Sequence, residues 1–339
     1  MNTPVARRVL SAAAAAALGL SLTACSALST ESSEPSGSDA PKDASGTLSV
    51  AVSFYPIQYL AETIGGDHVS VTSLTPTNVE PHDYDLSGKE VISTLEGSSL
   101  VAYVAGFQPS LDKAVAQISG PTVVDLSGEV DLQHHEGVED EDEHGEASDG
   151  TTEKATGEAG HEGHDHDAGS LDPHFWLDPV RMKSAATAVE EALAAADPDN
   201  ADDYKANLDS LTTTLDGLDS SYKGGLTRCE RKTFITSHAA FGYLADRYRL
   251  TQVSISGIDP EAEPSAADIA AAKKAVEDTD STTIFTEELL SPEIADAIAS
   301  ETGATTDVLS PIESAPEDTD YAGAMSNNLD ALRTALACK

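Results

Sequence analysis

Strand-like and helix-like segments alternate twice along this chain, first over about residues 47–127 and again over about residues 232–338. Short runs such as "KTFITS" and "TTIFT" are typical of buried strands, and "PEIADAIASETG" is a helical segment that ends in glycine. Alternation of this kind indicates parallel sheets covered by helices. The sequence therefore predicts an α/β fold with two similar lobes, each built on a mainly parallel sheet.

One apolar stripe predicts a long helix between the two lobes. Its side chains are spaced three or four residues apart, and they are Tyr204, Leu208, Leu211, Leu215, Leu218 and Tyr222. On a helix these positions share one face, and about 25 residues at 1.5 Å per residue extend about 38 Å. We expect residues 197–226 to form a rigid connecting helix between an N-terminal lobe, residues 47–196, and a C-terminal lobe, residues 227–339.

The beginning of the chain has the layout of an export signal. Two arginines precede an apolar run that ends in "LTAC", which resembles the lipobox of bacterial lipoproteins. The resemblance implies removal of residues 1–24, acylation of Cys25 and a flexible tether over residues 25–46. The alternative is an ordinary secretory signal in which Cys25 has no role. Later stretches fall short of the roughly 18–20 apolar residues of a membrane span. We therefore expect an exported protein, lipid-anchored to the outer face of the cytoplasmic membrane.

Residues 128–170 differ from the rest of the chain in composition. They are rich in Asp, Glu and His and contain almost no apolar residues, which predicts a disordered insertion. The histidines of this insertion are His134, His135, His144, His161, His164 and His166. We expect them to offer weak secondary metal sites without fixed geometry. The alternative is a solvated acidic linker in which these histidines matter little.

The formal net charge of −40 at pH 7 limits the partners of this protein. Nucleic acids and anionic lipid surfaces are repelled by such a charge, whereas cations are attracted. We expect a monomer that binds no nucleic acid and has a cation as its natural ligand.

Two cysteines remain when Cys25 is set aside, Cys229 and Cys338. Pairs of cysteines in exported proteins most often form disulfides. Closing a loop of this length contributes up to roughly 4–5 kcal/mol in the chain-entropy model. Because the two residues lack the CxxC spacing of a metal site, we predict a structural disulfide.

Three histidines lie outside the acidic insertion and close to the ends of predicted strands. They are His82 in "EPHDYD", His174 in "DPHFWLDP" and His238 in "TSHAAFGY". Ligands bind at the carboxyl ends of strands in open α/β sheets, and three convergent imidazoles suit zinc, copper or nickel. Each histidine taken alone could instead be a hydrogen-bonding loop residue, the role that we assign to His68. Because the three come from both lobes, we expect a metal site in the cleft between the lobes.

The motifs around these histidines resemble those of one family. "PHDYDL", "DPHFWLDP" after a His- and acid-rich loop, and "TSHAAFGYLADRYRL" are similar to the zinc-binding members of the cluster A-I substrate-binding proteins of metal ABC transporters. The resemblance extends from about residue 47 to the C-terminus. It implies two α/β lobes bridged by a rigid helix, limited hinge motion, and delivery of Zn(II) to an ABC transporter permease.

The resemblance also implies a fourth ligand after a strand near the end of the second lobe. Glu313 occupies the matching place, Glu287 is the second choice, and Glu80 beside His82 is the third, acting through a water. Three histidines with a water ligand are a further alternative. Manganese receptors of the family carry a Glu where this chain has His238, and imidazole-rich sites favour zinc. Copper(II) is intrinsically bound more tightly than zinc, so ligand type alone does not fix selectivity.

Two other function classes compete with a transport receptor. A zinc-dependent hydrolase also uses three histidines with an open position, but the chain has no His-Glu-x-x-His helix. A surface adhesin is the second class, and no sequence feature argues for it. We expect a receptor without enzymatic activity whose zinc affinity drops as the pH falls through about 6. Four further residues are candidates to support the site or to pack beside it, namely Asp83, Tyr84, Trp176 and Asp178. For Trp176 and Asp178 we expect core packing and helix capping.

Overall fold

A computed structural model of the chain describes residues 46–135 and 171–339. These residues belong to one compact unit, residues 39–339. The predicted signal segment, the lipidation site at Cys25 and almost all of the predicted tether lie outside the described residues. So do His144, His161, His164 and His166 of the predicted acidic insertion.

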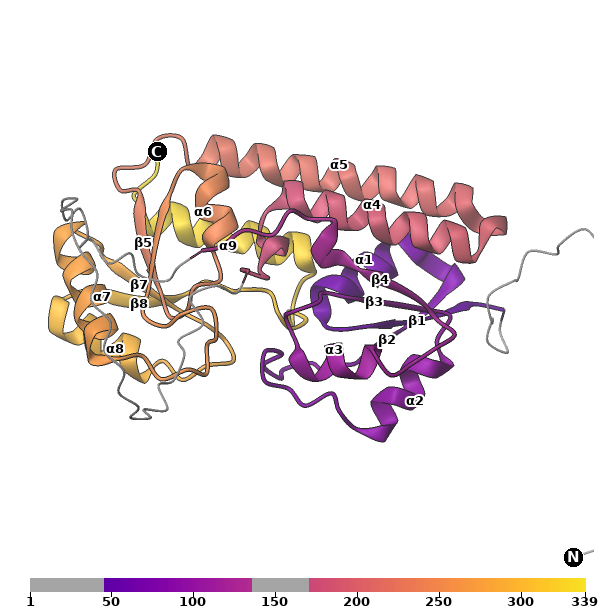
Figure 1. Ribbon diagram of the computed structural model, residues 1–339. Coiled ribbons are helices and arrows are strands. Elements are labelled where there is room, and N and C mark those ends of the chain that lie inside the picture. Colours follow the sequence, from indigo (N-terminus) through magenta and orange to yellow (C-terminus); the bar gives the residue numbers. More distant parts are fainter. Residues whose placement is uncertain (1–45, 136–170) are drawn as a thin grey trace, which may run out of the picture. The chain divides into compact units, whose positions relative to one another are not determined.

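The first sheet is entirely parallel and has the strand order β2-β1-β3-β4 (Figure 1). Its strands are β1 (Leu48–Val52), β2 (Val69–Ser73), β3 (Leu100–Tyr103) and β4 (Thr122–Asp125). The helices of this part are α1 (Tyr55–Gly65), α2 (Lys89–Gly97) and α3 (Pro109–Val115), with 3-10 turns η1 (Gly66–His68) and η2 (Leu126–Gly128). The central strands β1 and β3 are buried and the edge strands are more exposed, as expected when helices cover both faces of a parallel sheet.

The second sheet repeats this arrangement in the order β6-β5-β7-β8, again with all strands parallel. Its strands are β5 (Thr233–Thr236), β6 (Thr251–Ser254), β7 (Thr283–Thr286) and β8 (Thr305–Val308). The helices are α6 (Gly242–Tyr248), α7 (Ala266–Asp278), α8 (Glu293–Thr302) and α9 (Tyr321–Ala335). In both sheets the first strand lies between the second and the third. The predicted α/β fold with two similar parallel sheets is confirmed.

Two long helices, α4 (Pro179–Ala196) and α5 (Ala201–Gly225), run side by side along the top of Figure 1. All six residues of the predicted stripe on α5 are buried. The helix also packs against α1 and α9, so it contacts both halves of the chain. It begins at Ala201, because Pro198–Asn200 forms a separate 3-10 turn, η4.

Among the described helices, none combines the length and apolarity of a membrane span. The lobe boundaries near residues 196 and 227 stay predictions.

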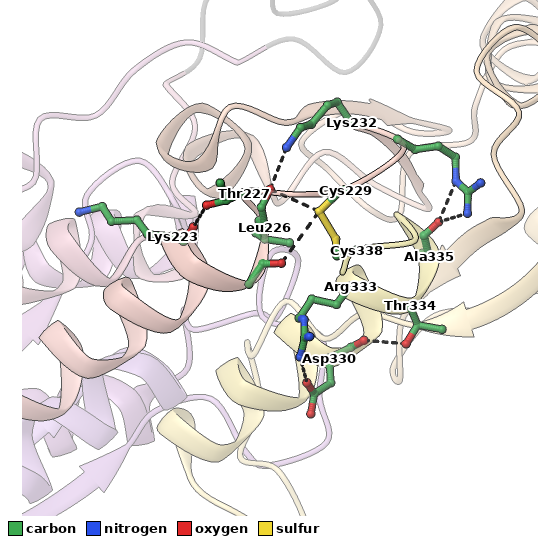
Figure 2. Close-up of a disulfide and its surroundings, with 12 residues drawn as sticks. Lys223, Leu226, Thr227, Cys229, Lys232, Asp330, Arg333, Thr334, Ala335 and Cys338 are labelled. Carbon is green, nitrogen blue, oxygen red and sulfur yellow. Dashed lines mark hydrogen bonds and ion pairs between the residues drawn. A yellow bond between two sulfur atoms is a disulfide. The ribbon is translucent and has the colours of Figure 1, made fainter.

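The predicted disulfide joins Cys229 to Cys338 (Figure 2). It links the segment after α5 to the end of the chain, where the backbone N–H of Lys339 also donates to the carbonyl of Arg228. The disulfide and this hydrogen bond therefore hold together the beginning and the end of the second half of the chain.

Residues 128–135 differ from the sequence-based expectation. The composition predicts that they belong to the disordered insertion, but the structure describes them, with Val130 buried. The guanidinium of Arg181 donates to the carbonyls of Val130 and Asp131, both at 2.6 Å. One buried valine and these two hydrogen bonds hold this segment on α4, which composition alone did not reveal.

Candidate metal centre

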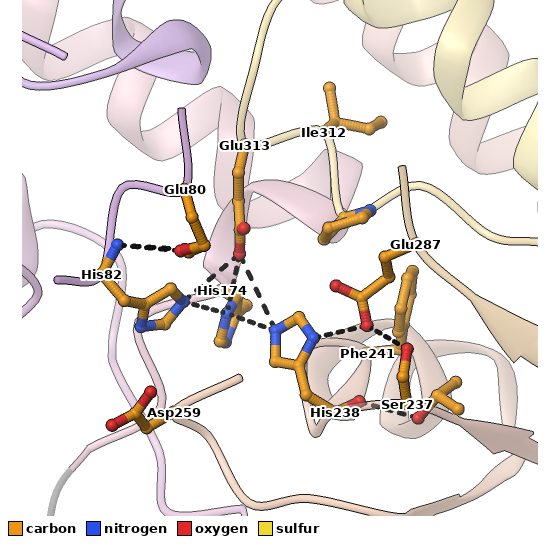
Figure 3. A network of polar contacts seen from close by, with 12 residues as sticks. Glu80, His82, His174, Ser237, His238, Phe241, Asp259, Glu287, Ile312 and Glu313 are labelled. Carbon is orange, nitrogen blue, oxygen red and sulfur yellow. Dashed lines mark hydrogen bonds and ion pairs between the residues drawn. The ribbon is translucent and has the colours of Figure 1, made fainter. Parts of the chain in front are cut away.

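Four side chains from four separate segments converge on one point, as Figure 3 shows. They are His82, His174, His238 and Glu313, and one ligand atom of each lies within 4.8 Å of the others. His82 lies between β2 and α2, and His174 immediately precedes the 3-10 turn η3 (Phe175–Leu177). His238 follows β5 and Glu313 follows β8. The structure thus brings the three predicted histidines together with the first-choice carboxylate.

The distances between the ligand atoms fit a single tetrahedral ion. The Nε2 atom of His174 lies 3.3 Å from Nε2 of His82 and 3.4 Å from Nε2 of His238. The Oε1 atom of Glu313 lies 3.2 Å from His174, 3.3 Å from His82 and 3.8 Å from His238. Zinc–ligand bonds of about 2.0–2.1 Å place tetrahedral ligand atoms about 3.3–3.4 Å apart. Four of these five distances match a tetrahedral zinc site to within about 0.2 Å, and the four ligand atoms all lie within 4.8 Å of one another.

Two carboxylates fix which ring nitrogens face this point. The Nδ1 atom of His174 lies 2.7 Å from Oδ1 of Asp172, and Nδ1 of His238 lies 2.6 Å from Oε1 of Glu287. Because an ionised carboxylate only accepts hydrogen bonds, both Nδ1 atoms are donors. Each Nε2 atom is then left as the metal-binding nitrogen. Partners of this kind set the tautomer and raise the basicity of histidine ligands.

His82 is held differently from the other two histidines. Its ring lies edge-on to Phe107, with 4.6 Å between the ring centroids. Its backbone N–H donates to the carboxylate of Glu80 at 3.0 Å. The ring is therefore positioned by packing and by its backbone, and no carboxylate bonds its Nδ1 atom among the interactions of the described residues.

Burial and charge shift the pKa values of the site in opposite directions. Burial lowers the pKa of His82. For His174, burial also acts to lower the pKa, but the adjacent carboxylates of Asp172 and Glu313 outweigh it and raise the pKa to about 9. Burial acts to raise the pKa of Glu313, but hydrogen bonds from His174 and His82 hold it below its ordinary value. The carboxylates of Asp172 and Glu313 thus favour the protonated form of His174, and an ion that binds its Nε2 atom must displace that proton.

The other predicted carboxylates lie beside the four ligands and outside their cluster. Glu287 accepts from His238 and, at 2.6 Å, from the hydroxyl of Ser237, so it orients a ligand. Glu80 bonds the backbone of His82, and burial together with the charge of Glu313 raises its pKa to about 8.

Several other residues named from the sequence are not among the four converging ligands. The ring of His68 forms a hydrogen bond of 2.9 Å with the carboxylate of Asp203, in agreement with the hydrogen-bonding role predicted for it. Asp83 is exposed, and Tyr84 is partly buried. Asp178 accepts from the backbone N–H of Val180 and so caps α4. Trp176 is fully buried.

The structure describes two histidines of the predicted acidic insertion. His134 is exposed. Both ring nitrogens of His135 have carboxylate partners, Asp172 at 2.6 Å and Asp246 at 3.1 Å. In this conformation His135 is a structural residue, and a role for it as a weak metal ligand stays a prediction.

Asp172 is the functional residue that the sequence analysis missed. One of its oxygens accepts from both Nδ1 and the backbone N–H of His174, and the other bonds His135. Its backbone carbonyl accepts from the hydroxyl of Tyr243 at 2.6 Å. The signal was present in "DPH", because an aspartate two residues before a histidine can fold back onto its backbone N–H.

Comparisons with known proteins show which family the chain resembles. Residues 50–335 match the family described as "Zinc-uptake complex component A periplasmic". The chain is 34% identical over 332 residues to the high-affinity zinc uptake system protein ZnuA of Bacillus subtilis, covering 96% of both chains. It is 33% identical to the zinc-binding lipoprotein AdcA of Streptococcus pneumoniae, covering 86% of this chain, and it spans 56% of that relative's length.

Solved structures resemble the chain over most of its length. The Zn(II)-bound ZnuA-like domain of S. pneumoniae AdcA superposes with a TM-score of 0.67 at 28% identity, covering 86% of this chain and 99% of the domain. The laminin-binding protein Lmb of Streptococcus agalactiae, described as having adhesin and metal-transporting activity, gives 0.71 at 27% identity, covering 85% and 99%. By the match over residues 50–335 and the likeness to B. subtilis ZnuA, the chain belongs to the ZnuA family of zinc-uptake proteins.

Proposed function

We propose that this protein is an extracytoplasmic receptor that captures Zn(II) and delivers it to the permease of an ABC transporter. The observation that carries the proposal is the convergence of three imidazole Nε2 atoms and one carboxylate oxygen within 4.8 Å of one another. The zinc-binding names of its relatives support the same ligand.

The ligand set favours zinc over manganese. Three imidazoles and a single carboxylate suit zinc, whereas manganese prefers oxygen ligands. The alternative of a manganese receptor is therefore disfavoured by His238, which contributes a third nitrogen. The type and number of ligands do not exclude copper(II). The availability of each metal outside the cell therefore decides between copper(II) and zinc.

The same geometry argues against a hydrolase. Catalytic zinc sites keep three protein ligands and leave the fourth position open for water or substrate. Here Oε1 of Glu313 lies 3.2, 3.3 and 3.8 Å from Nε2 of His174, His82 and His238, which supports a role as the fourth ligand. We therefore propose a receptor without enzymatic activity.

An adhesin role is the second candidate, and the likeness to Lmb of S. agalactiae favours it. Adhesion and metal capture can coexist in one chain. Binding of the purified protein to immobilised laminin, with and without zinc, tests this candidate.

We further propose that Cys25 carries a lipid anchor, that residues 25–46 tether the receptor to the membrane, and that it acts as a monomer. Mass spectrometry of the protein from its native membrane tests the anchor by the mass of the acyl groups. A mature chain without acyl groups at Cys25 contradicts it.

Metal titration tests the receptor function directly. Purified protein should contain about one tightly bound zinc per chain by elemental analysis, and competition should show weaker binding of manganese. His174→Ala and Glu313→Gln should weaken zinc binding, whereas the control His68→Ala should not, because His68 bonds Asp203 and is not one of the four converging residues. Absence of tight zinc, or tighter binding of manganese, contradicts the proposal. Growth of a deletion strain under zinc limitation then tests transport.

Deleting residues 136–170 separates the main site from any weak sites in the acidic insertion. The four ligands lie outside the deleted segment, so one tight site should remain and the weaker binding contributed by His144, His161, His164 and His166 should disappear. Loss of the tight site in this variant would mean that the insertion supplies an essential ligand.

A further inference from the structure

Trp176 is placed to influence three of the four ligands. Its fully buried indole lies 5.1 Å from the ring of His174 and 5.6 Å from the ring of Phe107, centroid to centroid. Phe107 in turn packs edge-on to His82. The indole N–H of Trp176 donates to the carbonyl of Pro311 at 2.7 Å, two residues before Glu313.

The residue between Pro311 and Glu313 has an unfavourable backbone conformation. Ile312 has a φ of 57°, in the left-handed region that β-branched residues rarely adopt. Such a conformation persists only where its surroundings hold it, and it is frequent beside functional groups. Figure 3 shows Ile312 directly beside Glu313, whose carboxylate turns toward the three histidines.

A set of hydrogen bonds holds this strained segment from both sides. The backbone N–H of Ile312 donates to the hydroxyl of Ser310 at 3.2 Å, and Asn328 bonds the backbone N–H and carbonyl of Ser310 at 2.9 and 2.6 Å. On the other side, the only side-chain bond to Pro311 among the interactions of the described residues comes from Trp176. The hydroxyl of Tyr321 donates to the carbonyl of Trp176 at 2.5 Å and so fixes the indole's own backbone.

We propose that Trp176 is a positioning residue of the metal site, whose indole N–H holds the Pro311 carbonyl and thereby directs Glu313 toward the histidines. The inference rests on the proposed function, since it concerns the same site. Trp176 lies two residues after His174, on the turn η3, while Pro311 belongs to the segment after β8. One side chain thus connects a ligand from the first half of the chain with the ligand from the end of the second.

The chain contains a single tryptophan, which permits a clean test. Replacing all tryptophan with β-(benzothien-3-yl)alanine during expression changes only position 176. Sulfur replaces the indole N–H in this analogue, so the ring shape is kept and the donor is lost. The full chain with 5-fluorotryptophan, which keeps the N–H, is the matched control.

Two measurements report on the position of Glu313. Zinc affinity of the benzothienyl protein should fall about tenfold or more, the usual effect of removing a residue that orients a ligand. The visible spectrum of bound Co(II), which depends on the ligand set, should shift toward that of Glu313→Gln. In a Glu313→Gln background, the replacement should change affinity by less than about twofold, because the group being positioned is absent.

Tyr222→Phe controls for the loss of a buried hydrogen bond elsewhere. Its hydroxyl donates to the carbonyl of Met325 at 2.7 Å, so this variant should leave affinity and the Co(II) spectrum unchanged. Trp176→Phe is a second, genetically encoded variant that lacks the N–H, and it should shift the spectrum in the same direction.

The outcomes separate this inference from the proposed function. If the unmodified protein binds zinc tightly, and the benzothienyl protein has the same zinc affinity and the same Co(II) spectrum, the role of Trp176 is overturned and the proposed function stands. Failure of the unmodified protein to bind zinc tightly overturns both. An equal loss of affinity with and without Glu313 also overturns the inference, since the indole then acts through packing.

Discussion

At the scale of single residues, proton positions decide how the site binds a metal. Asp172 and Glu287 accept from the Nδ1 atoms of His174 and His238, so the Nε2 atoms of both rings are directed at the metal position. The Nε2 atom of His174 also faces Glu313 at 3.2 Å. Proton and metal therefore compete for the same nitrogen.

Zinc affinity should fall with acidification already from about pH 9. The pKa of His174 is raised to about 9, so below that pH the metal-free site holds a proton that zinc must displace. Each pH unit below about 9 then costs about tenfold in affinity from this group, and above it the dependence disappears. Chelator competition between pH 6 and 9.5 measures this, with calorimetry in two buffers to count released protons. A constant affinity between pH 7 and 9 would contradict the assignment.

Glu287→Gln should weaken zinc binding about 10- to 100-fold. The amide can still accept a hydrogen bond from His238, but it removes the negative charge that makes the imidazole a better donor to the metal. Glu288→Gln is the matched control, because Glu288 is the exposed next residue. Competition titration compares the two variants. Equal affinities would mean that Glu287 serves only the packing of β7.

At the scale of elements, the short helix α6 ties the second half of the chain to the segment that carries His174. Tyr243 donates to the carbonyl of Asp172, and Asp246 bonds His135. Arg247 bonds the carboxylate of Asp178 through two of its nitrogens, at 2.9 and 2.5 Å. Because α6 begins four residues after His238, one element sets the separation of two ligands.

Gly242→Ala should destabilise the protein by about 1–3 kcal/mol through overpacking. A methyl group at Gly242 would lie 2.4 Å from the ring of His135, and the ring can move away only by giving up its bond to Asp172. Gly217→Ala on α5 is the control, since it meets open space and should stabilise the helix by up to about 1 kcal/mol. Urea unfolding of both variants measures the difference. A neutral Gly242→Ala would show that His135 has room to move.

At the scale of the whole molecule, the chain is held together by apolar packing and one covalent link. Buried residues of α1, α4, α5 and α9 belong to one continuous core cluster, which extends from Leu48 to Leu336. The disulfide closes a loop with a sequence separation of 109 residues inside this assembly.

Reduction of the disulfide should lower the free energy of unfolding by up to about 5 kcal/mol, as chain entropy predicts for a loop of this length. Zinc affinity should stay the same, because the four ligands lie on other segments. Urea unfolding with and without reductant measures the first effect, and the Cys229→Ser/Cys338→Ser double variant is the control for reductant. A large loss of zinc affinity would mean that the bridge also positions the site.

Local patterns in the sequence predict the two parallel sheets, the helix α5 and the three converging histidines, since apolar spacing selects helices and strands, and the carboxyl ends of parallel strands meet at one edge. The disulfide partners follow from the cysteine count, and Glu313 is implied by the family resemblance, with other carboxylates left open. The roles of Asp172, Glu287 and Trp176 and the anchoring of His135 emerge from the folded structure. Trp176 bonds a carbonyl 135 positions away and Glu287 bonds His238 across 49 positions, and such partners depend on how the folded segments pack, which no local pattern records.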